Sequence, residues 1–158
     1  MEWIDLVLKV STVIGGLTAV AGGLTALVTF RRSARLKRAE WLYNLHVKFY
    51  EAANYKPIRR ILDYEPSAEL TRLRETIEKG ANDDLAEALV DYLNFFEFVA
   101  SLLKLKQLSE REILMLFEYY LRRIRDHPFV VAFVQQEGFE SLAELLNKLP
   151  DAAMKTRR

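Results

Sequence analysis

VSTVIGGLTAVAGGLTALVTF, residues 10–30, decides how this chain is organised. It contains 21 residues without a charge, between Lys9 and Arg31. As an α-helix this stretch spans about 31 Å, close to the roughly 30 Å of a bilayer's hydrocarbon core. Each of its glycines would cost a soluble helix about 1 kcal/mol, whereas membrane helices tolerate glycine and place it at helix contacts. The stretch therefore predicts one transmembrane helix.

Two other interpretations of this stretch are a buried core helix of a soluble protein and a signal peptide. Ala19-Val20-Ala21 has the small-x-small form of a cleavage site, but the acidic Glu2 and Asp5 stand where a signal peptide is basic. The apolar run also continues past Ala21 and ends in the basic RRSARLKR of residues 31–38, which is a stop-transfer pattern. We therefore favour a membrane helix that is retained.

The formal net charge of +1 over 158 residues conceals an uneven distribution. Residues 1–38 carry six basic and two acidic side chains, a charge of +4, and the other 120 residues carry 17 basic and 20 acidic, a charge of −3. The positive-inside rule then predicts a short N-terminus outside and a cytoplasmic C-terminal body. We expect the basic collar to contact lipid headgroups, although an RNA-binding patch is an alternative. The collar consists of Arg31, Arg32, Arg35, Lys37 and Arg38.

One face of the predicted span is made of small and hydroxyl-bearing side chains, and bulky aliphatic residues occupy the other. Such a face favours close helix approach with interhelical hydrogen bonds, and the partner helix must come from another chain. We predict that this face drives homo-oligomerisation, and it could also line a narrow pore. A plain anchor with incidental small residues is the alternative. The face consists of Ser11, Gly15, Thr18, Gly22, Thr25 and Thr29.

The body predicts an all-α bundle, because helix caps are frequent and strand alternation is absent. We expect a transmembrane segment with its collar over 1–38, a cytoplasmic bundle over 39–150 and a flexible tail over 151–158. Lys56-Pro57 should break one helix, and Gly80 should end another. Asp84 with Glu87 and Ser109 with Glu112 should open two further helices as capping boxes.

A polar stripe follows the predicted helix from Asp84 to about Lys106. We expect this stripe to face solvent, and the alternative is a contact with another subunit. The stripe consists of Asp84, Glu87, Asp91, Asn94, Glu97, Ser101 and Lys104.

The body offers one candidate for chemistry. There are no cysteines and two histidines, so no disulfide or Cys-ligated metal site is expected, and no nucleotide-binding or hydrolase motif occurs. We expect no metal and no cofactor. In RRIRDH, residues 122–127, four residues separate Arg122 from His127. A histidine can transfer protons in RNA cleavage, and an arginine can stabilise charge on the phosphate. The plain alternative is that basic residues here complement the end of a helix.

This spacing resembles the R-x4-6-H motif of HEPN-fold ribonucleases, which are α-helical bundles that pair two motifs across a dimer. The resemblance implies that Arg122 and His127 are catalytic, whereas Arg123 departs from the smaller polar residue of many family members. The layout of span, basic collar and helical body with YLNFFE at residues 92–97 resembles the small membrane-anchored, HEPN-like accessory proteins of type VI-B CRISPR systems. That resemblance implies the bacterial inner membrane and a CRISPR RNA-guided effector as partner.

The function that this resemblance implies is that of an oligomeric antiviral defence effector, which forms a pore and depolarises the membrane when RNA-targeting immunity is triggered. Two alternatives remain open: a membrane-tethered, metal-independent HEPN-type ribonuclease, and a non-enzymatic scaffold for a protein partner. The net charge of −3 on the body weakens the attraction to RNA and hence the ribonuclease interpretation. We therefore expect a protein that is not an enzyme.

Overall fold

The computed structural model describes the backbone of residues 2–64, 68–80 and 83–150, but not the side chains of residues 2, 4–22 and 24. The chain divides into two units, Met1–Leu45 and His46–Arg158. The predicted tail over 151–158 lies outside the described residues. In the described residues every regular element is helical, which confirms the all-α prediction. The helices are α1 (Glu2–Glu51), α2 (Tyr55–Asp63), α3 (Ala68–Glu78), α4 (Asp84–Lys104), α5 (Glu110–Arg125), α6 (Pro128–Gln136) and α7 (Glu140–Lys148).

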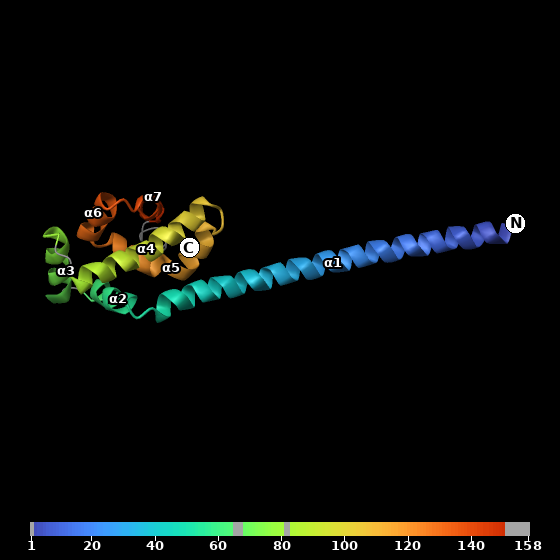
Figure 1. The fold of residues 1–158 in the computed structure, drawn as a ribbon. Coiled ribbons are helices and arrows are strands. Elements are labelled where there is room, and N and C mark those ends of the chain that lie inside the picture. Colours follow the sequence, from blue (N-terminus) through green and yellow to red (C-terminus); the bar gives the residue numbers. More distant parts are fainter. Residues whose placement is uncertain (1, 65–67, 81–82, 151–158) are drawn as a thin grey trace, which may run out of the picture. The chain divides into compact units, whose positions relative to one another are not determined.

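Helix α1 contains 50 residues. Figure 1 shows it as one uninterrupted helix. Its backbone includes the predicted span over 10–30 and continues through the collar to Glu51. Most side chains of the span lie outside the described residues. Among the side chains that are described, no helix is both long and apolar enough to cross a membrane.

Helix α1 ends earlier than the sequence predicts. The break lies at residues 52–54 rather than at Lys56-Pro57, and Pro57 sits inside the first turn of α2. Proline is tolerated there because the first N–H groups of a helix have no intrahelical partner. The prediction of a break at Pro57 is therefore wrong by a few residues, although it correctly separates two helices.

The two predicted capping boxes have different outcomes. Ser109 and Glu112 form a complete capping box at the start of α5. At the start of α4, however, the cap is Asp83 and not Asp84: the Asp83 carboxylate accepts from the N–H groups of Leu85 and Ala86 at 3.0 and 2.9 Å. Asp83 has the extended backbone that a cap requires, whereas Asp84 already belongs to the first turn.

Helix α4 is the centre of the second unit. It packs against α2, α3 and α7, and Figure 1 shows it in the middle, between α2 and α7. Its inner side chains are fully buried and carry the aromatic core of the body, with each buried large side chain contributing about 1.5–3 kcal/mol. The largest of the buried side chains are Tyr92, Phe49, Phe96, Phe117, Ile58, Leu62 and Leu73.

The polar stripe of α4 does not simply face solvent, as the sequence led us to expect. Glu97 accepts from the backbone N–H groups of Ser141 and Leu142 at 3.1 and 2.7 Å, and so caps the start of α7. Lys104 forms an ion pair with Glu144 at 3.0 Å. The carboxyl-terminal half of the stripe is therefore the seam with α7.

We predict that the stability of the body falls at low pH partly through Asp83. The backbone N–H of Ala86, with that of Leu85, stabilises the carboxylate and holds the pKa of Asp83 below its ordinary value, against an opposing effect of burial. A lowered folded-state pKa means that this contribution is complete above the unfolded value of about 3.9 and disappears as the pH falls through the folded value. Urea midpoints of the full chain, followed by helical circular dichroism between pH 5 and pH 3, measure the loss.

Asp83→Asn is the matched control, because asparagine caps a helix without titrating. The stability difference between the natural chain and Asp83→Asn should shrink as the pH falls. A difference that is the same at pH 5 and pH 3 would contradict the role of the Asp83 charge.

Candidate functional site

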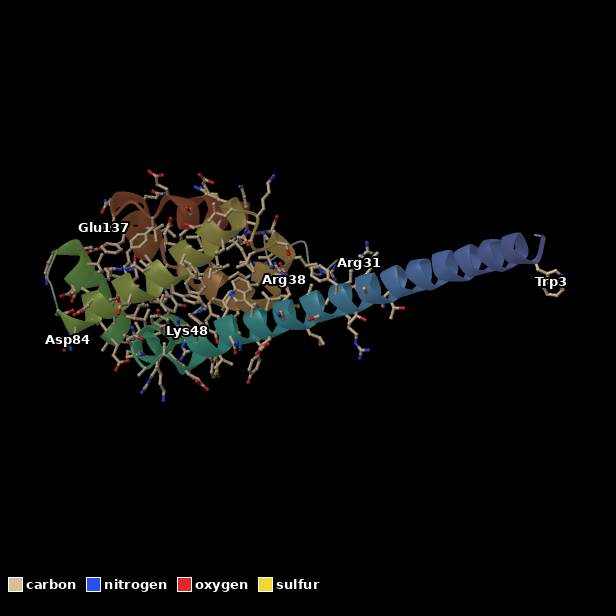
Figure 2. The ribbon with its side chains drawn as sticks, turned by 45° about the vertical axis from the view of Figure 1, so that its right-hand side comes forward. Trp3, Arg31, Arg38, Lys48, Asp84 and Glu137 are labelled. Carbon is tan, nitrogen blue, oxygen red and sulfur yellow. The ribbon has the colours of Figure 1, made fainter. Side chains whose placement is uncertain are left out.

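The described part of α1 carries the basic collar on its surface. Every residue of the collar is exposed. The Arg38 guanidinium lies 5.7 Å from the ring centre of Trp41 and makes a cation–π contact. Figure 2 shows Trp3 at the N-terminal end of α1, with Arg31 and Arg38 farther along the same helix. The collar is therefore exposed along its whole length.

The predicted oligomerisation face is described only at its C-terminal end. Thr25 and Thr29 are exposed, and the Thr29 hydroxyl donates to the Thr25 carbonyl at 2.9 Å. At the neighbouring Gly23, an added Cβ would meet nothing within 4 Å. The other predicted members, Ser11, Gly15, Thr18 and Gly22, lie outside the described side chains.

The predicted catalytic pair, Arg122 and His127, has separate partners in the structure. Arg122 donates through Nε and Nη2 to Oε1 of Glu118, at 3.0 and 2.9 Å, one turn earlier on α5. His127 is 2% exposed, and its Nε2 lies 3.1 Å from the carbonyl oxygen of Leu62. A carbonyl only accepts, so the ring carries hydrogen on Nε2 and donates. The geometry gives His127 a structural role, and a catalytic role for the pair stays a prediction.

The carbonyl of Leu62 connects α2 to the end of α5 and to the loop between α5 and α6. Arg123 Nη2 donates to the same oxygen as His127, and Arg123 Nε lies 3.7 Å from Oδ1 of Asp63. Asp63 also accepts from the hydroxyl of Tyr119 at 2.9 Å. This hydrogen bond raises the pKa of Tyr119 and keeps its phenol protonated as a donor.

Arg59 holds the C-terminal end of α1, a contact that the sequence analysis missed. Its guanidinium donates to the carbonyl of Tyr50 at 2.9 Å and to that of Phe49 at 3.5 Å. The same group lies 4.8 Å from the ring centre of Tyr50 and 5.2 Å from that of Phe49. A cation suits this end of a helix, where carbonyl groups lack partners. The sequence did not single out Arg59, because the adjacent Arg60 is the same residue type. Only the structure shows that Arg60 is exposed whereas Arg59 contacts α1.

An open cleft of about 920 Å³ lies beside this contact. Tyr50, Tyr64 and Tyr120 line it, together with Arg59 and Asp63. Burial raises the pKa of Tyr120, and the nearby Arg59 partly opposes the increase. The cleft thus presents phenol side chains and charges of both signs. Within the described residues, no group of three histidine or acidic side chains gathers in a way that would hold a metal ion.

Comparison of the chain with protein-family models, with curated proteins and with solved structures finds no match.

We predict that His127→Ala destabilises the protein by about 2 kcal/mol, because it removes a buried hydrogen-bond donor and leaves space in the core. Arg122→Ala should cost less than about 1 kcal/mol, since its partner Glu118 lies on the same helix and both side chains are partly exposed. Urea denaturation of the full chain measures both values. His127→Gln, which can still donate to the Leu62 carbonyl, should recover part of the loss. Equal costs for the two alanine variants would contradict the structural role of His127.

A second prediction concerns the contact of Arg59 with α1. Arg59→Ala should destabilise the protein by about 2 kcal/mol, because two hydrogen bonds from a charged group and two cation–π contacts are lost together. Arg59→Lys keeps the charge but cannot make the same planar contacts, so it should recover less than half of the loss. Arg60→Ala is the matched control and should change stability by no more than about 0.5 kcal/mol. An Arg59→Ala variant as stable as Arg60→Ala would show that the contact does not hold the end of α1.

Proposed function

We propose that the protein is a single-pass protein of the bacterial inner membrane that self-associates through α1 and permeabilises the membrane as an antiviral effector. Its helical body would lie in the cytoplasm. The role in defence is supported by the resemblance in layout to the HEPN-like accessory proteins described above. The membrane part is supported by features of α1 itself.

The observation that carries the proposal is the spacing of Trp3 and the basic collar on one continuous helix. Arg31 follows Trp3 by 28 positions, which corresponds to about 42 Å of helix and matches the roughly 40–45 Å of a bilayer with its headgroup regions. Tryptophan is enriched at membrane interfaces, and basic residues are enriched at the cytoplasmic one. Trp3 is 81% exposed, and the collar residues are exposed as well. The segment from Trp3 to Arg31 therefore carries side chains typical of a membrane interface at both of its ends.

The small-residue face supports association. Gly23 leaves open space beside the helix, and a neighbouring backbone can approach closely there. The Thr29 hydroxyl bonds to its own helix, so it brings no unsatisfied donor into an apolar contact. A helix with these features can pack against copies of itself.

The test is to replace Gly15 and Gly22 together by leucine in the full chain. We expect the oligomer seen by light scattering in detergent to dissociate, and dye release from vesicles to be lost, because leucine holds the helices apart. The matched control is Val20→Leu with Val28→Leu, which adds bulk on the opposite side and should leave both readouts unchanged.

Three results would overturn the proposal. A natural chain that fails to insert into vesicles contradicts the membrane helix, and a Gly15→Leu/Gly22→Leu variant that still assembles and releases dye contradicts the association face. A monomer or dimer that releases no dye but binds a partner protein would favour the scaffold instead.

A further inference from the structure

A second, smaller cavity lies where α2, α3 and the first turn of α4 meet. Its volume is about 380 Å³, which lies within the range typical of small-molecule sites. Pro57, Ile61 and Leu85 give it apolar walls. None of the catalytic, oligomerisation or collar residues predicted from the sequence lines it, and it lies wholly within the second unit.

Positive charge is concentrated around this cavity. Lys56 and Arg60 from α2 and Arg72 from α3 line it, against the single carboxylate of Glu69. The cavity therefore carries a formal charge of +2, although residues 39–158 as a whole carry −3. Three cations around one small volume repel one another, and an anion bound among them would relieve the repulsion.

Asp83, which forms an ion pair with Arg72, does not neutralise this cluster. Its carboxylate lies 3.6 Å from Arg72 Nη2, and the Arg72 side chain is 72% exposed, so the pair is weak. Asp83 instead accepts from the N–H groups that open α4. Arg72 is thus held beside the cavity while its charge remains available to a ligand.

We propose that this cavity binds a phosphate monoester that carries an apolar substituent. Arginine binds two phosphate oxygens through its planar fork, and lysine adds a point charge. A monoester carries a charge of about −1.5 to −2 at pH 7, which complements the +2 of the cavity. The apolar walls of Pro57, Ile61 and Leu85 take up the substituent and release water from it.

A phosphate monoester with an apolar substituent can come from two sources, a soluble ester or the headgroup region of a phosphatidate lipid. A carboxylate with one charge would leave a cation uncompensated, and inorganic phosphate would leave the apolar walls in contact with water. The proposal concerns the body alone, so it does not depend on the membrane role of α1.

The test is calorimetric titration of the full chain in a neutral detergent solution, which does not require α1 to insert into a bilayer. The probes are phenyl phosphate as the soluble ester, dihexanoyl phosphatidate below its micelle concentration as the lipid, and inorganic phosphate as the comparison. At least one ester should bind tenfold or more tightly than inorganic phosphate, and the binding should weaken from pH 7.5 to pH 5.5 as the ester takes up a proton. Binding of phenyl phosphate assigns the soluble source, and binding of the phosphatidate alone assigns the lipid.

Arg60→Gln provides the decisive variant, because Arg60 is exposed and its replacement leaves the helix intact. We expect it to weaken ester binding at least tenfold without changing the thermal midpoint. Arg111→Gln, an exposed arginine on α5 outside the cavity, is the matched control and should bind as the natural chain does. Absence of ester binding, equal binding of inorganic phosphate, or binding that survives Arg60→Gln would each overturn the proposal.

Discussion

The unpaired backbone groups at helix ends are the constraint on which the body depends. A helix leaves its last carbonyls and first N–H groups without intrahelical partners, and a body of short helices has many such ends. Here side chains from other helices supply the partners: Arg59 holds the end of α1, Arg123 and His127 hold Leu62 near the end of α2, and Arg125 donates to Leu149 after α7 at 2.9 Å. Glu97 does the same for the N–H groups that open α7. Each contact supplies a hydrogen-bond partner to a backbone group and also joins two elements. The same interactions therefore satisfy the helix ends and hold the helices of the body together.

Phe49 shows why the last turn of α1 belongs to the body. Its side chain is fully buried, with its ring centre 4.8–5.8 Å from those of the six aromatic residues that surround it. Most of these ring pairs are tilted or edge-to-face, arrangements that add to the stabilisation from burial alone. Arg59 covers one side of this cluster and pairs with the Phe49 carbonyl. The aromatic side chain and the backbone of the same residue are thus held by separate interactions. The six aromatic residues around the Phe49 ring are Tyr55, Tyr92, Phe95, Phe96, Phe117 and Tyr120.

The features that could be predicted from the sequence are those encoded within a few residues. The Ser109–Glu112 box and the turn at Gly80, with its φ of +61°, depend on neighbours in the chain. The cap of α4 was misplaced by one residue because Asp83 and Asp84 offer the same chemistry, and only the backbone conformation distinguishes them. The role of Glu97 could not be predicted, since its partners lie 44 and 45 residues away. The cavity at Arg60 was missed for the same reason, because it needs α2, α3 and α4 to be brought together.

The basic residues show why net charge is a poor guide to where anions bind. In α5, the arginines of the predicted catalytic motif interact with neighbouring groups of the body. Arg122 bonds to Glu118, and Arg123 contacts the Leu62 carbonyl and Asp63. In α1, by contrast, the collar is exposed and contributes its charge to the surroundings. The cations of α2 and α3 are a third case, since they line a cavity with apolar walls where a bound anion would be partly shielded from water. These cations come from two helices and meet at one cavity with apolar walls, so the cavity can select an anion by its shape as well as by its charge. The collar lies on a single exposed helix and offers charge alone, so the cavity is the better candidate for selective anion binding.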